Sequence, residues 1–116
     1  MKILKTNIPD LESNKKELYI LTRGVSLSVQ KMTDEELTKA YPVNGYALYE
    51  EENSTGEVVE VLAIKTTGTV LSTISQTFKD EFLYIADLFG NDPFSIRVVR
   101  DVSSKGRTFY TCALDI

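Results

Sequence analysis

The stretch TFKDEFLYIADLF, from Thr77 to Phe89, carries the strongest periodic signal in the chain. Its large apolar residues recur at the spacing of one helical face, which predicts an amphipathic α-helix buried along Phe78, Phe82, Ile85 and Phe89. Ser75 or Thr77 can cap the N-terminus of this helix, and Gly90 can end it. We therefore expect one full helix in the C-terminal half of the chain.

The segments on both sides of this helix have the composition of strands joined by turns. Residues 52–56 and 66–68 contain the Asn, Ser, Thr and Gly typical of turns, and residues 103–106 form a further loop. The expected strands are Tyr46 to Glu51, Val58 to Lys65, Thr69 to Ile74, Phe94 to Arg100 and Arg107 to Ile116.

The order from residue 43 to the end is therefore three strands, a helix and two strands. An OB-type barrel has this order, with five strands and one helix between the third and fourth of them. We predict a mainly β fold in which residues 43–116 form this barrel. A small α+β sandwich is the structural alternative.

Residues 1–42 are expected to form an N-terminal extension that packs on the barrel within a single domain. Leu18 to Leu21 and Val25 to Val29 resemble short strands. The run Thr33-Asp34-Glu35-Glu36 has the pattern of a capping box that opens a short helix.

The composition excludes most catalytic and metal sites. The chain has no His and one Cys, so it lacks the usual general base, the nucleophile–His pairs and the common zinc ligand sets. It also has no glycine-rich phosphate-binding motif. The acidic run Glu50 to Glu52 has the features of a solvated hairpin end. We therefore expect a protein that is not an enzyme and that uses no metal or cofactor.

Several features favour a soluble cytoplasmic protein. The chain of 116 residues is 42% hydrophobic and 26% charged, which is ordinary for a folded domain. No apolar run approaches the roughly 20 residues of a membrane helix, and no signal peptide is apparent at the start. A single cysteine, Cys112, cannot form an internal disulfide and is expected to be a small core residue.

The charge of this acidic chain is unevenly distributed. The net charge is −4, which argues weakly against nucleic acid binding. Residues 41–92 contain two Lys and nine acidic residues, whereas residues 93–116 contain four Lys or Arg and two Asp. The last two predicted strands are therefore locally basic.

Alternation in the last strand places a basic and an aromatic residue on one face. Tyr110, Cys112, Leu114 and Ile116 share one side and are expected in the core, whereas Arg107, Phe109 and Thr111 share the other. An outward Phe beside an outward Arg suits base stacking with phosphate contact. The alternative is that Phe109 packs beneath the N-terminal extension.

Three short motifs resemble small OB-fold single-stranded-DNA-binding-like proteins of Gram-positive phages, conjugative plasmids and integrative elements. They are Tyr46 to Glu50, Ser75 to Phe78, and Ser104 to Phe109 with Cys112 to Leu114, and the resemblance spans residues 17–116. It implies an OB-fold and a role in the replication or transfer of mobile DNA. The chain lacks the tryptophans and the long acidic tail of housekeeping single-strand binders.

We accordingly predict a non-enzymatic protein that binds single-stranded DNA with little sequence preference. The expected site lies over the second and third barrel strands, between the loops 53–56 and 103–106. The expected DNA-binding residues are Lys65, Arg97, Lys105 and Arg107 for phosphates, with Phe109 and Tyr49 for bases. Replication or conjugation proteins are candidate partners, and a homo-oligomer is left open. The alternatives are a protein-interaction module that uses the same face and a small phage inhibitor of a host enzyme.

Overall fold

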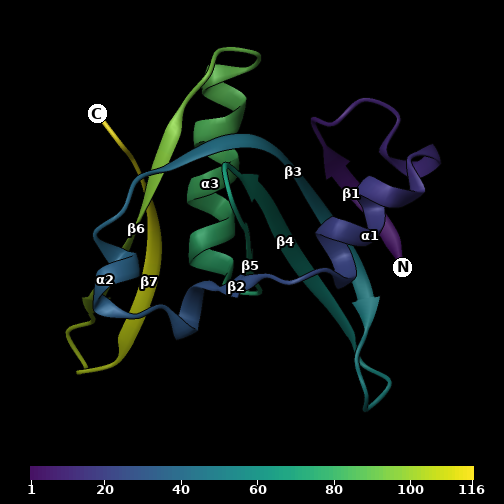
Figure 1. Ribbon diagram of the computed structural model, residues 1–116. Helices are drawn as coiled ribbons and strands as arrows, with labels where there is room; N and C mark the ends of the chain where they lie inside the picture. The colour runs from purple at the N-terminus through teal and green to yellow at the C-terminus, as the bar shows by residue number, and fades with distance from the viewer.

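The computed structural model describes all 116 residues and is mainly β (Figure 1). Its strands are β1 Lys2–Thr6, β2 Leu27–Ser28, β3 Tyr41–Glu52, β4 Val58–Thr66, β5 Val70–Thr73, β6 Ser95–Val102 and β7 Thr108–Leu114. Its α-helices are α1 Lys15–Arg23, α2 Asp34–Leu37 and α3 Gln76–Phe89. Two short 3-10 helices are η1 Leu11–Ser13 and η2 Val29–Lys31.

The predicted count of five strands is wrong, because the N-terminal region adds two more. With β1 and β2 included, α3 follows the fifth strand of the chain instead of the third. The strand predicted at Leu18 to Leu21 is wrong as well, since these residues belong to α1. Asn14 caps this helix by accepting a hydrogen bond from the Glu17 N–H at 3.1 Å. The second predicted strand, Val25 to Val29, is reduced to the two residues of β2.

All seven strands belong to one curled sheet. The order is β2-β5-β4-β3-β6-β7, with β1 added beside β3, and only the β2–β5 pairing is parallel. The long β3 joins the two halves, because Tyr41 and Pro42 pair with β6 and residues from Val43 onward pair with β4. Figure 1 shows β3 arching from one half to the other. Since β7 pairs with β6 alone, the sheet is a half-barrel.

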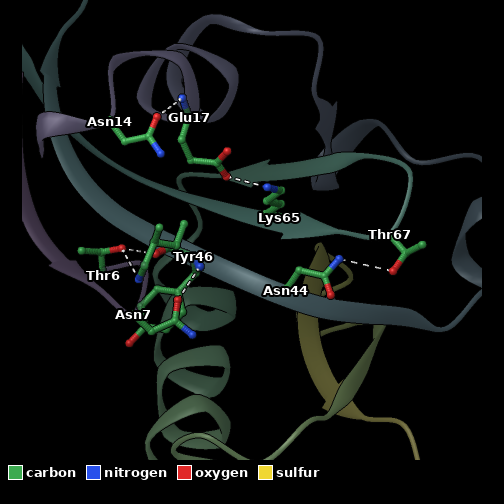
Figure 2. A network of polar contacts seen from close by, with 9 residues as sticks. Thr6, Asn7, Asn14, Glu17, Asn44, Tyr46, Lys65 and Thr67 are labelled. Atoms are coloured by element: carbon green, nitrogen blue, oxygen red, sulfur yellow. Dashed lines mark hydrogen bonds and ion pairs between the residues drawn. The ribbon is translucent and has the colours of Figure 1, made fainter. Parts of the chain in front are cut away.

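A bend in β3 anchors the end of β1. The register between β3 and β4 shifts just before Gly45, and a Cβ atom at this glycine would lie 2.7 Å from Ile8 Cγ1. Next to it, the Tyr46 N–H donates to Asn7 Oδ1 at 2.8 Å, and the Thr6 hydroxyl donates to the Tyr46 carbonyl at 2.6 Å (Figure 2). Glycine at position 45 therefore allows close approach of the N-terminal segment.

The main core fills the space between α3 and the concave face of the sheet. Ser75 caps α3 by accepting from the Phe78 N–H, and Gly90 ends it with a φ of 59°. Phe78 and Phe82 are completely buried, and the Phe82 ring meets Tyr46 edge-on at a centroid distance of 5.3 Å. The other buried core residues are Val29, Met32, Tyr41, Leu48, Leu62, Ile64, Leu71, Ile85, Ala86, Ile96, Val98 and Cys112.

One charged residue of α3 is also buried. Lys79 is 3% exposed, and its Nζ lies 2.8 Å from Glu60 Oε2 and donates to the Glu60 carbonyl at 3.1 Å. The partner strand β5 pairs with β4 only from Leu62 to Lys65, so Glu60 has no strand neighbour on that side. The Lys79 ammonium group therefore supplies a hydrogen bond to β4 at a position where no residue of β5 pairs with the strand.

A second, smaller core lies on the opposite face of the sheet. It consists of Leu11, Leu21, Ala47, Tyr49, Ala63 and Val70, with Ile3, Ile8, Leu18 and Val61 at its margin. Residues of η1 and α1 thus cover the outer face of β3, β4 and β5. Two ion pairs hold α1 there, Glu17 with Lys65 at 2.7 Å and Arg23 with Glu51.

The segment after α1 spans the open side of the half-barrel. β2 pairs with β5, and the following η2 packs against both β5 and β7. Val29 is completely buried and Met32 is 4% exposed, and both belong to the main core. Residues 1–42 therefore contribute to the sheet and to both cores.

Candidate nucleic-acid interface

The turn between β6 and β7 presents two predicted site residues, Lys105 and Arg107. The Ser103 N–H donates to the Arg107 carbonyl at 2.8 Å, and the Gly106 N–H donates to the Ser103 carbonyl at 2.9 Å. Gly106 has a φ of 80°, which a residue with a side chain rarely adopts. This tight turn leaves both cationic side chains exposed at the end of the hairpin.

The predicted alternation of β7 is confirmed up to Leu114. Cys112 lies in the main core, and Tyr110 and Leu114 pack against it. Phe109 is half-buried and belongs to neither core, and it pairs across the hairpin with Asp101. The prediction that Ile116 is buried is wrong, because β7 ends at Leu114 and Ile116 is fully exposed.

Arg97 lies on the same outer face as Phe109, further from the turn. Asp101, the partner of Phe109, is four positions further along β6, which corresponds to about 13 Å along the strand. The Arg97 guanidinium contacts Asp115 Oδ1 at 2.6 Å and the Thr38 carbonyl at 3.0 Å. An exposed ion pair of this kind contributes little to stability, so the guanidinium can exchange a carboxylate for a phosphate.

Lys105 and Arg107 differ from the other predicted cations in having no ion-pair partner. Lys65 and Arg97 are both within 2.7 Å of a carboxylate oxygen. The six ion pairs of the structure include neither cation of the turn. We call Lys105, Arg107 and Phe109 the hairpin patch. The nearby Asp101 reduces its positive charge without abolishing it.

The structure separates Lys65 and Tyr49 from the hairpin patch. Figure 2 shows Lys65 bound by Glu17 of α1, and Tyr49 is only 4% exposed in the smaller core. Burial, and then the Glu51 carboxylate, raise the pKa of the Tyr49 phenol. The two hairpin turns expected to flank one site lie at opposite lower corners of Figure 1. The outer face of β4 and β5, where we expected DNA, is covered by α1.

Sequence reasoning missed the residues that cover this face. Leu21 lies in the segment that we interpreted as a strand and Glu17 directly precedes it, and both contact the outer face of the sheet from α1. A helical signal was available, because Asn14 can cap a helix and Leu18 and Leu21 have helical spacing.

The remaining reactive group, Cys112, lies inside the main core. It is 3% exposed, as we expected for a core residue. Burial, with a smaller effect of the Glu81 carboxylate, raises the pKa of Cys112 to about 12. The thiol is therefore protonated at neutral pH. No group of three or more His, Cys, Asp or Glu side chains is placed to hold a metal ion.

We predict that Cys112 of the folded protein reacts very slowly with Ellman's reagent near pH 8, since the thiolate is the nucleophile. The same sample should react fully in concentrated guanidinium chloride, which is the internal control. The measurement is the absorbance of the released thiolate with time. A native reaction as fast as that of the unfolded chain would contradict the burial of this thiol.

Comparisons with protein-family models, curated proteins and solved structures find no match to this chain. The resemblance to single-strand binders stays a prediction from the residues. None of the helices combines the length and the apolar character needed to cross a membrane.

Proposed function

We propose that this protein is a non-enzymatic, cytoplasmic binder of single-stranded DNA with little sequence preference, acting in the replication or transfer of mobile DNA. The observation that carries the proposal is the hairpin patch, in which two exposed cations without an ion-pair partner precede the half-buried Phe109 at the start of β7. Single-strand binders combine these two elements, a positive track for phosphates and aromatic faces for bases.

The proposed site is narrower than the one expected from sequence. It contains Lys105, Arg107 and Phe109, with Arg97 as a further phosphate contact along β6. Lys65 and Tyr49 have no part in it, because α1 covers the face on which they lie. Bases would lie against the outer side of the β6–β7 hairpin.

The order of elements from β3 to β7 supports an OB-type assignment within this proposal. Three strands, α3 and two strands follow one another, and β3 pairs with β6 at one end and β4 at the other. OB-folds are Greek-key barrels that are themselves partly open. In this chain, β2 and η2 lie where a fully closed barrel would bring β5 and β7 together.

The proposal is tested by two variants with different expected signatures. Lys105→Ala combined with Arg107→Ala should weaken binding of a fluorescent oligonucleotide of about 30 bases for all sequences alike. It should also lower the salt slope by about 0.7 for each lost phosphate contact. Phe109→Ala should cost roughly 1–3 kcal/mol of binding free energy while the salt slope stays unchanged. Fluorescence anisotropy at several salt concentrations measures both quantities.

A matched control removes two charges elsewhere. Lys15 and Lys16 are exposed on α1 and form no ion pair, so changing both to Ala alters the net charge by the same amount. This control should retain wild-type binding. Equal losses in both double variants would contradict a local site. If the wild type binds no oligonucleotide at low salt, the proposal is wrong, and the protein-interaction module replaces it.

A further inference from the structure

The solvent-facing side of α3 carries apolar residues in addition to its buried side. Phe78, Phe82, Ile85 and Ala86 face the core, whereas Tyr84 and Leu88 are 65% and 67% exposed. These two residues are four positions apart, so they are neighbours on the helix surface. A helix covered on one side normally presents polar residues to water. Two large exposed apolar side chains one turn apart therefore need a separate explanation.

The residues around this pair are acidic. At 100° per residue, Asp80, Glu81 and Asp87 project within about 60° of Tyr84, and all three are exposed. Only Asp87 has an ion-pair partner, Lys5 of β1 at 2.7 Å. The one cation of α3, Lys79, is buried against Glu60 on the other side. The exposed face of α3 thus combines an apolar centre with an acidic rim in which Asp80 and Glu81 form no ion pair.

We propose that this face of α3 is a docking surface for a basic amphipathic segment of a partner protein. The apolar side of that segment would pack on Tyr84 and Leu88, and its Lys or Arg residues would lie near Asp80 and Glu81. Tyrosine is enriched among the residues that dominate binding energies at interfaces. A second copy of the chain fits less well, because two acidic rims would face each other across a twofold interface.

This surface is separate from the proposed DNA site. α3 packs against β7 from the core side, whereas Phe109 faces outward from the same strand. A partner on α3 would leave the hairpin patch free, so the protein could hold DNA and a partner together. The inference does not depend on DNA binding, since it uses none of the hairpin residues.

The test uses a fluorescent peptide of about 18 residues built from Lys and Leu at helical spacing. Its control is a peptide of the same composition with the spacing scrambled. Anisotropy should show binding of the amphipathic peptide alone, and chemical-shift changes in a ¹⁵N-labelled sample should centre on residues 80–92. Tyr84→Ser with Leu88→Ser, and separately Asp80→Asn with Glu81→Gln, should each weaken binding by about tenfold.

A matched charge control separates docking from general attraction to an acidic protein. Glu52 and Glu57 are exposed near the β3–β4 turn and form no ion pair, so Glu52→Gln with Glu57→Gln removes the same charge elsewhere. This control should bind as the wild type does, and all variants should keep the wild-type melting temperature. Equal weakening in the control, equal binding of the scrambled peptide, or self-association abolished by the Tyr84 and Leu88 changes would overturn the proposal.

Discussion

Phe82→Ala should lower the free energy of unfolding by about 3–5 kcal/mol. The ring is completely buried at the centre of the main core, between Tyr46 at 5.3 Å and Phe94 at 6.2 Å between ring centroids. Truncation removes the buried apolar surface and leaves a cavity that the curled sheet cannot easily fill. It also removes two aromatic contacts, which contribute beyond their buried area. Urea unfolding followed by circular dichroism measures the loss.

Tyr84→Ala, two residues further along α3, is the matched control. Tyr84 is 65% exposed, so its removal should change the unfolding free energy by no more than about 0.5 kcal/mol. Both substitutions replace an aromatic residue with the best helix former, and their difference isolates burial. A loss below about 1 kcal/mol for Phe82→Ala would mean that α3 does not fill the half-barrel.

The C-terminal elements could be predicted because their signals are local. The buried face of α3 follows from residues three and four apart, and Phe82 was identified in this way. The two faces of β7 follow from simple alternation, which placed Cys112 inside and Phe109 outside. Each pattern depends on one covered side and one free side.

Tyr49 could not be placed because β3 has no free side in its middle. The run Tyr46-Ala47-Leu48-Tyr49 is buried throughout, with Tyr46 and Leu48 in the main core and Ala47 and Tyr49 in the smaller one. A strand covered on both faces shows a continuous apolar run instead of alternation. The pattern therefore indicated burial without indicating which layer covered each face.

The ion-pair partner of Lys65 could not be predicted from the sequence for a different reason. Glu17 lies 48 residues earlier in the chain and meets Lys65 only because α1 packs across the outer face of the sheet. Counting charges by segment cannot reveal an ion pair between residues that are far apart in the chain. It therefore led us to assign Lys65 to DNA binding, although Lys65 is paired with Glu17 in the folded protein. Lys105 and Arg107 of the β6–β7 turn form no ion pair in the folded protein, and their role in DNA binding stays a prediction.

Leu21→Ala should lower the free energy of unfolding by about 2–5 kcal/mol. Leu21 is 3% exposed on the inner side of α1 and packs in the smaller core with Leu11, Tyr49 and Val70. If the N-terminal region is part of the folding unit, the loss appears in one cooperative transition of the whole protein. The chain has no tryptophan, so tyrosine fluorescence can be compared with circular dichroism across the same urea series.

The result that would contradict this expectation is local unfolding of the N-terminal region before the rest of the protein unfolds. In that case Leu21→Ala would leave the main transition in place and add an earlier one of small amplitude, in which α1 separates from the sheet. Tyr19→Ala is the control on the same helix, because Tyr19 is 63% exposed and should change stability by no more than about 0.5 kcal/mol. The two probes would then disagree for Leu21→Ala alone. We expect them to coincide, since β1 and β2 on either side of α1 are paired into the sheet that forms the main core.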